Sequence, residues 1–193
     1  MNVTSGDEVR VAAYSDADYA NDPVDRRSVS VYMTTLGGNV VSYASRKQEI
    51  NALSTCEAEY IAMSEATKDL LWLSGLYKEL EWKHSVPLLL GDNQGAIALT
   101  AKPGKHPKSK DIDNKRYMVR RNVELKLLTT QRVGTEDMVA DIMTKALGGV
   151  KFARFRRAMQ VLLVLRDSGA TTSTTSSEAA ASSTMDEAAA SRD

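Results

Sequence analysis

The sequence has very little cysteine and no long apolar run. Its 193 residues include one cysteine, Cys56, which excludes an internal disulfide framework and any zinc cluster that needs several thiolates. The longest apolar runs, such as residues 161–165, fall far short of the roughly 20 residues that a membrane span needs, and no secretory signal opens the chain. We therefore expect an intracellular protein, cytoplasmic or nuclear, with no redox chemistry and no small-molecule cofactor.

The chain also has no net charge, since 25 Lys and Arg balance 25 Asp and Glu. Any nucleic-acid binding must then rest on local charge. Residues 102–132 hold ten basic residues against three acids. This basic stretch either follows the phosphates of a nucleic acid, with a salt-dependent affinity, or is a solvated loop and helix face. Within this stretch, the candidate residues for binding a nucleic acid are Lys105, Lys108, Lys110, Lys115 and Arg116.

Apolar periodicity predicts a β-meander followed by a long helix. Period-two patterns predict strands at residues 8–15, 28–36 and 40–45, with the second hairpin turning at two consecutive glycines. From about Ser54 the period becomes helical for some 27 residues, with Thr55 as a possible N-cap.

The second half of the chain predicts two further strands among helices. The expected order is a strand at 86–90, a helix opened by Asp92, a helix at 111–125, a strand at 126–133, a helix capped by Thr135, and an amphipathic helix from Phe152 to Leu162. This order predicts the α/β class, with a mixed five-stranded sheet flanked by helices.

Composition divides the chain into three parts. We expect a flexible N-terminus at residues 1–8, one domain at 9–165 and a disordered tail at 166–193. Ser, Thr and Ala fill 19 of the 26 positions in 168–193, so there is little to bury against the entropy of ordering.

Two of the acidic residues follow predicted strands. Asp16 ends the first strand and Asp92 ends the fourth, and an α/β sheet binds ligands just beyond the carboxyl ends of its strands. The two carboxylates could therefore converge. Taken singly, Asp16 fits ordinary turn chemistry equally well, and Asp92 fits a helix N-cap.

Helical phase separates two glutamates of the long helix. Glu59 lies within about 40° of the apolar stripe that includes Met63 and Leu70, whereas Glu57 lies about 160° away. A carboxylate on a buried stripe is costly unless it is paired, hydrogen-bonded or bound to metal. We therefore expect Glu59 to be the functional residue and Glu57 to be solvated.

Asp141 is the fourth candidate. It lies opposite the apolar face of its predicted helix, where it could reach the other acids or simply be solvated. Four gathered carboxylates repel one another without metal, but they can hold two divalent ions about 4 Å apart, which suits phosphodiester hydrolysis.

Five ordered blocks carry a family resemblance. They are Tyr14-Ser15-Asp16-Ala17-Asp18-Tyr19-Ala20 followed by Asp25-Arg26-Arg27-Ser28, then Ser45-Arg46-Lys47-Gln48, the residues 52–62, Asp92-Asn93-Gln94-Gly95-Ala96-Ile97, and the residues 135–145. Over about residues 11 to 163 the chain closely resembles the ribonuclease H domain of copia-type retrotransposons.

The resemblance implies a ribonuclease H-like fold and a metal-dependent endonuclease that degrades the RNA strand of RNA–DNA hybrids during reverse transcription. It implies two Mg²⁺ or Mn²⁺ ions as cofactors. It places the first, third and fourth acids at Asp16, Asp92 and Asp141. The superfamily pattern around the second acid matches Glu59-Tyr60-Ile61-Ala62, in agreement with the helical phase.

Some positions depart from the family pattern, which leaves a second interpretation open. Asp111, Arg116 and Tyr117 stand where the family usually has a histidine and a tyrosine-histidine pair. No polymerase precedes the motifs, so we expect a fragment or remnant of a larger polyprotein. The alternatives to an active nuclease are an inactive remnant that at most binds nucleic acid, and a module that needs a reverse transcriptase domain encoded elsewhere.

Overall fold

A computed structural model describes residues 8–101 and 110–161, with residues 110–112 described as backbone only. The predicted disordered tail, and all but one residue of the predicted flexible N-terminus, lie outside this part of the chain. The described residues belong to one compact unit, Met1–Leu162. Within it the strands are β1 (Val11–Asp18), β2 (Val29–Leu36), β3 (Asn39–Lys47), β4 (Leu88–Gly91) and β5 (Thr129–Arg132).

The five strands of the described chain form one mixed sheet in the order β3-β2-β1-β4-β5. The meander β1-β2-β3 is antiparallel, while β4 pairs parallel to β1 and β5 parallel to β4. Parallel pairing needs crossover connections, which the helices between these strands supply. This arrangement confirms the predicted α/β class with a mixed five-stranded sheet.

Helix α1 (Thr55–Glu79) is the longest element and packs against the sheet. Its stripe of buried side chains packs with apolar residues of β1 and β4 in the main core. The members from α1 are Tyr60, Met63, Ala66, Leu70, Leu73 and Tyr77. This stripe has the phase expected from the sequence, so α1 fixes which side of its first turns faces the sheet.

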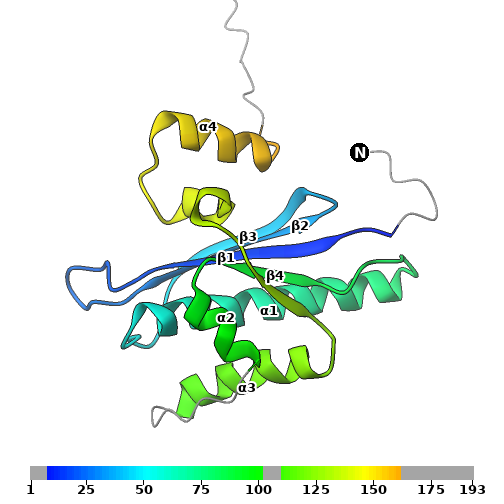
Figure 1. The fold of residues 1–193 in the computed structure, drawn as a ribbon, viewed down its shortest axis with the longest axis horizontal. Coiled ribbons are helices and arrows are strands. Elements are labelled where there is room, and N and C mark those ends of the chain that lie inside the picture. Colours follow the sequence, from blue (N-terminus) through cyan, green and yellow to red (C-terminus); the bar gives the residue numbers. More distant parts are fainter. Residues whose placement is uncertain (1–7, 102–109, 162–193) are drawn as a thin grey trace, which may run out of the picture. The chain divides into compact units, whose positions relative to one another are not determined.

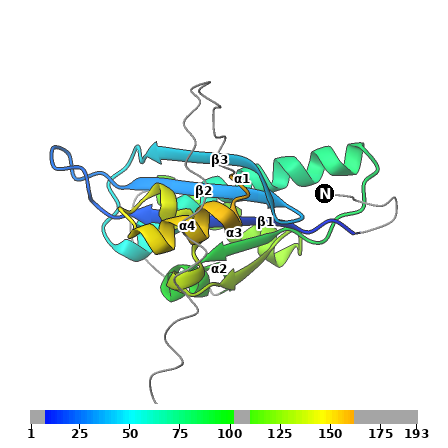
Figure 2. The same ribbon diagram turned by 90° about the horizontal axis from the view of Figure 1, so that it is seen from above.

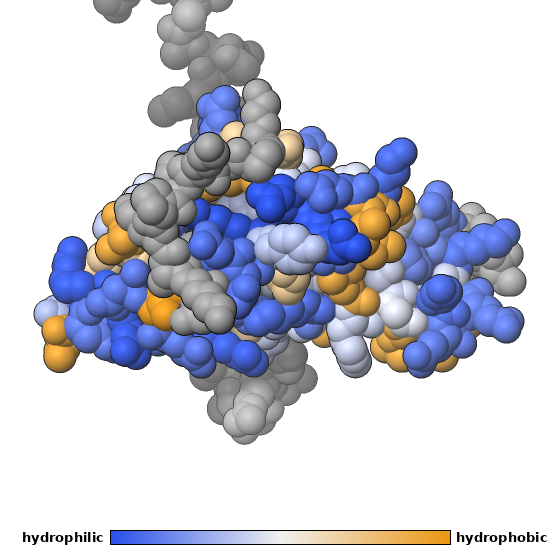
Figure 3. All heavy atoms as spheres, turned by 90° about the horizontal axis from the view of Figure 1, so that it is seen from below, coloured by the Kyte–Doolittle hydropathy of each residue, from blue (hydrophilic) through white to orange (hydrophobic). Residues whose placement is uncertain are grey.

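Helices cover both faces of the sheet (Figure 1). Helices α2 (Gln94–Ala101) and α3 (Lys110–Glu124) lie with α1 on one face, and that side is mostly hydrophilic with scattered apolar patches (Figure 3). The other face carries two short 3₁₀ helices, η1 (Thr135–Asp137) and η2 (Val139–Met143), and α4 (Gly149–Ala158), which packs on η2 (Figure 2). None of the helices in the described part is long and apolar enough to cross a membrane.

Several local predictions differ from the structure: the last helix spans Gly149–Ala158 and the fifth strand Thr129–Arg132, and three differences lie near the predicted acids. The N-cap of α1 is Ser54 rather than Thr55, and its side chain accepts a hydrogen bond from the backbone N–H of Glu57. Strand β1 continues to Asp18, so Asp16 lies inside the strand. The helix expected from Thr135 is instead the pair η1 and η2; the N-cap of η1 is Gly134, and the Thr135 hydroxyl donates a hydrogen bond to the Asp92 carboxylate.

Candidate functional site

Parallel pairing of β1 and β4 brings two of the predicted acids together in the interior of the sheet. Tyr14 is the register partner of Leu90, so continuing two residues along each strand places Asp16 beside Asp92. Asp16 is buried in the middle of the sheet, whereas Asp92 lies half-buried in the turn between β4 and α2. Asp16, near the carboxyl end of β1, and Asp92, just after β4, are therefore adjacent, and the carboxyl ends of such strands commonly carry ligand sites.

The 3₁₀ helix η2 supplies the third carboxylate from above the sheet. Met138 and Ala140 pack on Val31 of β2 in a small core cluster, which fixes η2 on the face toward which Asp16 points. Asp141 is thereby completely buried. Asp16, Asp92 and Asp141 each offer an oxygen within 4.8 Å of the others. The structure thus brings together three of the four acids expected from the sequence.

Glu59 approaches the same place from the α1 side of the sheet. Its carboxylate accepts a hydrogen bond from the backbone N–H of Ala17, but its Oε2 atom is buried without a hydrogen-bond partner among the described residues. Burial and the nearby charges of Asp16 and Asp92 raise the pKa of Glu59 to about 9. A carboxyl group in this position is neutral at physiological pH until a cation reaches it.

The same environment also shifts the pKa of Asp92. Its partial burial, followed by the charge of Asp16, raises the pKa of its carboxyl group above the usual value. The hydroxyl of Thr135 donates a hydrogen bond of 3.3 Å to Asp92 Oδ2. These shifts are typical of a group of carboxylates that lacks enough positive charge nearby.

Two lysines and a threonine, to which the sequence assigned no role, also reach the acids. Lys145 Nζ lies 2.6 Å from Asp141 Oδ1 and 3.4 Å from Asp16 Oδ2, and Lys151 Nζ lies 3.4 Å from Asp141 Oδ2. The Thr144 hydroxyl donates a short hydrogen bond to Asp16 Oδ2. Burial alone would lower the pKa of Lys145, but its hydrogen bond to Asp141 and the charge of Asp16 outweigh it and raise the pKa. In the sequence, the i,i+4 spacing of Asp141 and Lys145 could have indicated the contact between these two residues.

The donor set fits a divalent metal ion. All four side chains offer carboxylate oxygens, the ligands that hard cations such as Mg²⁺ prefer. Besides Glu59 Oε2, the Oδ1 atom of buried Asp16 has no hydrogen-bond partner among the described residues. A buried, unpaired carboxylate oxygen is costly, and a metal ion would remove that cost.

Glu57 corrects one prediction, because it is buried rather than solvated. Its Oε2 atom accepts a 2.6 Å hydrogen bond from the backbone N–H of Leu53, and its Oε1 lies 3.7 Å from Arg116 Nη2. Ser54 and Glu57 have the S-x-x-E spacing of a capping box, but the glutamate folds back one residue further, to the N–H of Leu53 rather than to that of the N-cap residue. Phase along the helix predicts which side a residue occupies but not this backward fold of its side chain.

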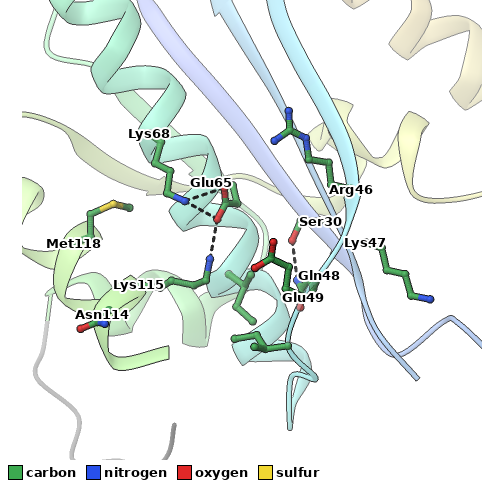
Figure 4. Close-up of a pocket in the computed structure, with 12 residues that line it drawn as sticks. Ser30, Arg46, Lys47, Gln48, Glu49, Glu65, Lys68, Asn114, Lys115 and Met118 are labelled. Carbon is green, nitrogen blue, oxygen red and sulfur yellow. Dashed lines mark hydrogen bonds and ion pairs between the residues drawn. The ribbon is translucent and has the colours of Figure 1, made fainter. Parts of the chain in front are cut away.

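The basic candidates lie against acids of the chain itself. Lys115 Nζ is 2.8 Å from Glu65 Oε1, and Figure 4 shows Lys68 reaching the same carboxylate at the edge of a pocket of about 500 Å³. Arg116 faces Glu57. Lys105 and Lys108 lie outside the described residues, as does the Lys110 side chain. The described basic candidates thus have internal partners.

Comparison with known proteins gives mostly transposon polyproteins, and also, at 45% identity over 74 residues, the secreted RxLR effector protein 161 of Plasmopara viticola, covering 38% of this chain and 52% of that protein. No family model matches the chain. It is 36% identical over 160 residues to the retrovirus-related Pol polyprotein from transposon RE2 of Arabidopsis thaliana, covering 82% of this chain and 11% of that protein. It is 34% identical over 147 residues to the corresponding polyprotein from transposon TNT 1-94 of Nicotiana tabacum, covering 76% and 11%. The chain therefore spans only about a tenth of the length of these polyproteins.

Among solved structures, the fold resembles the N-terminal RNase H domain of a Mycobacterium tuberculosis protein. The TM-score is 0.50 at 13% identity, with 78% of this chain and 99% of that chain covered. At this identity the likeness concerns the fold alone.

Proposed function

We propose that this chain is a metal-dependent endonuclease that cleaves the RNA strand of RNA–DNA hybrids. The chain is a homologue of a segment of retrovirus-related Pol polyproteins from plant transposons, and it has the ribonuclease H fold. The observation that carries the proposal is the convergence of Asp16, Asp92 and Asp141 within 4.8 Å. Three elements distant in sequence deliver these carboxylates to one point. The copia-type lineage and a role in reverse transcription, inside the cell, belong to the same proposal.

Asp16, Glu59, Asp92 and Asp141 would hold the metal ions. Bound Mg²⁺ or Mn²⁺ would supply an activated water and would stabilise the charge on the leaving oxygen of the phosphodiester. The chain's own residues set up this site before metal arrives. Burial of Asp16 and Asp141 fixes their carboxylates, and the Ala17 N–H orients Glu59 toward them.

The half-exposed Asp92 marks the open side of the site, through which a nucleic-acid backbone can approach. Lys115 and Arg116 are the described candidates for contact with that backbone, as members of the basic stretch. Each now faces an acid, so binding the hybrid would require exchange of Glu65 or Glu57 for a phosphate. This exchange predicts a modest contribution that falls with salt. A reverse transcriptase domain encoded elsewhere would be the natural partner that delivers the hybrid.

A cleavage assay tests the proposal. The purified chain is incubated with labelled RNA–DNA hybrid and Mg²⁺ or Mn²⁺, and with a chelator as a blank. We expect metal-dependent cleavage of the RNA strand that is lost in Asp16→Asn and Asp92→Asn. Asp18→Asn is the matched control, since Asp18 lies on the same strand but outside the acid cluster. Absence of cleavage, or equal cleavage by all variants, would refute the proposal.

An inactive remnant is the second candidate, and the two lysines on Asp141 favour it. In a decayed site these ammonium groups would simply replace the metal. Metal titration of the thermal unfolding temperature separates the candidates. A functional site gains about 2.7 kcal/mol at a metal concentration 100 times the Kd, hence a rise of roughly 5–10 °C. A remnant should show no rise beyond that of Asp16→Asn.

A further inference from the structure

The lysines divide the acid cluster into two unequal halves. On one side, both oxygens of Asp141 face an ammonium group, Lys145 at 2.6 Å and Lys151 at 3.4 Å. On the other side, Asp16 Oδ1 and Glu59 Oε2 are buried and have no hydrogen-bond partner among the described residues. The chain thus neutralises the Asp141 half itself and leaves the Asp16–Glu59 half for an external cation.

Lys145 connects the two halves. Besides its contact with Asp141, its Nζ lies 3.4 Å from Asp16 Oδ2, whereas the contact recorded for Lys151 within the cluster is to Asp141 alone. A positive charge between two buried carboxylates competes with any cation that would bridge them, because both are attracted to the same oxygens. A second metal ion would therefore bind where the Lys145 ammonium group now lies.

We propose that Lys145 acts as a built-in cation of the acid cluster, so that the chain takes up one divalent ion readily on the Asp16–Glu59 side and a second only by displacing the lysine from Asp141. This inference rests on the proposed function, because it treats the acid cluster as a metal site. Lys145 is in this view a positioning residue whose charge weakens the binding of the second ion.

The exposure of the groups makes such a displacement feasible. The Lys145 side chain is 42% exposed, while those of Asp16 and Asp141 are 1% exposed. The flexible lysine can therefore swing into solvent while the carboxylates keep their places. Without metal, the same ammonium group holds together two acids that would otherwise repel each other.

A purely structural ion pair and a built-in cation predict different measurements. Either role makes the loss of Lys145 lower the stability of the metal-free chain. Only the built-in cation changes the number and affinity of bound metal ions. Metal stoichiometry is therefore the decisive readout, and it does not depend on catalytic activity.

The test is a Mn²⁺ titration followed by calorimetry and by the paramagnetic resonance signal of free Mn²⁺. The wild type should bind one ion per chain well and a second much more weakly. In Lys145→Met the Kd of the second ion should fall by about tenfold or more, as expected when a competing charge a few Å away is removed. Lys145→Arg keeps the charge and should behave like the wild type. Lys68→Met removes an exposed lysine outside the cluster and should change nothing.

Two results would overturn the inference: two ions of similar affinity in the wild type, or an unchanged second Kd in Lys145→Met. If the wild type binds two equal ions and still cleaves the hybrid, the inference alone fails. If neither protein binds Mn²⁺, the metal site of the proposed function fails with it. Should Lys145→Met not fold, the wild-type stoichiometry decides the question by itself.

Discussion

The first turns of α1 hold two glutamates, two residues apart, that are both buried and yet differ completely in their surroundings. Glu57 accepts a hydrogen bond from the Leu53 N–H and faces the guanidinium of Arg116. Glu59 faces two further carboxylates, Asp16 and Asp92, and one of its oxygens has no partner among the described residues. The first glutamate is satisfied by the chain, while the second is left unsatisfied.

This difference shows that burial alone does not mark a functional acid. Both carboxylates would be costly to bury without partners. For Glu57, the hydrogen bond at the helix start and the ion pair with Arg116 offset that cost, so its role is to stabilise the fold. For Glu59, contacts within the described chain do not offset the cost of burial, and a carboxylate in this situation favours the binding of an external cation.

Exchanging each glutamate for glutamine gives the sharpest test of the contrast. Glu59→Gln removes a charge that would hold metal, so cleavage of the hybrid should fall by about a hundredfold or more. Glu57→Gln should keep most of the rate, since its partners are the helix start and Arg116. Initial rates in Mg²⁺ at equal concentrations of folded protein check this. The reverse order of effects would assign the functional role to Glu57.

The pH dependence of stability provides the second test. Because the folded pKa of Glu59, about 9, lies above the ordinary value of 4.5, the metal-free folded chain binds the proton more tightly than the unfolded chain. Glu59 therefore stabilises the fold at low pH and loses that contribution as pH rises toward 9. Between pH 5 and 8 we expect a loss of up to about 4 kcal/mol, the limit for one proton over three pH units.

Denaturant titrations in a chelator at several pH values measure this loss. Glu59→Gln cannot ionise, so its stability should change less between pH 5 and 8 and should exceed that of the wild type at pH 8. Glu57→Gln serves as the comparison and should retain the wild-type slope. Equal slopes in wild type and Glu59→Gln would contradict the assigned pKa.

The sequence predicted those parts of the fold and site that follow from periodicity and strand ends. The apolar stripe of α1 gave the phase of Glu59, and the expected positions of Asp16 and Asp92 at strand ends gave their neighbourhood. The β1–β4 pairing places the two residues side by side, although β1 continues two residues past Asp16. Both signals are local, since each needs only one element and its direction.

The remaining features depend on contacts between distant segments. Asp141 reaches the cluster because Met138 and Ala140 pack on β2, and no single helix pattern contains that contact. The burial of Glu57 depends on Arg116, which lies 59 positions later in the chain. The positions of Lys145 and Lys151 depend on how η2 and α4 follow one another. Such tertiary pairings override local phase, as they often do.

Removing the partner of Glu57 is the third test. Arg116→Met leaves the buried Glu57 carboxylate without its guanidinium and should cost about 1–3 kcal/mol of unfolding free energy. The loss should largely disappear in the double variant with Glu57→Gln, which removes the unpaired charge. Urea unfolding of the wild type, both single variants and the double variant measures the coupling. Additive effects would show that the 3.7 Å pair contributes nothing.

The smallest expected effect concerns the cap that aligns both glutamates. Ser54 accepts the Glu57 N–H at 3.2 Å, so Ser54→Ala should destabilise the chain by about 1 kcal/mol, whereas Thr55→Ala, one position later, should change stability much less. Urea unfolding in a chelator resolves the two. The cap also sets the direction in which α1 leaves the loop, and thereby the approach of Glu59 to Asp16. If the Mn²⁺ affinity of Ser54→Ala equals that of the wild type, Glu59 is held by the stripe packed on the sheet rather than by the helix start.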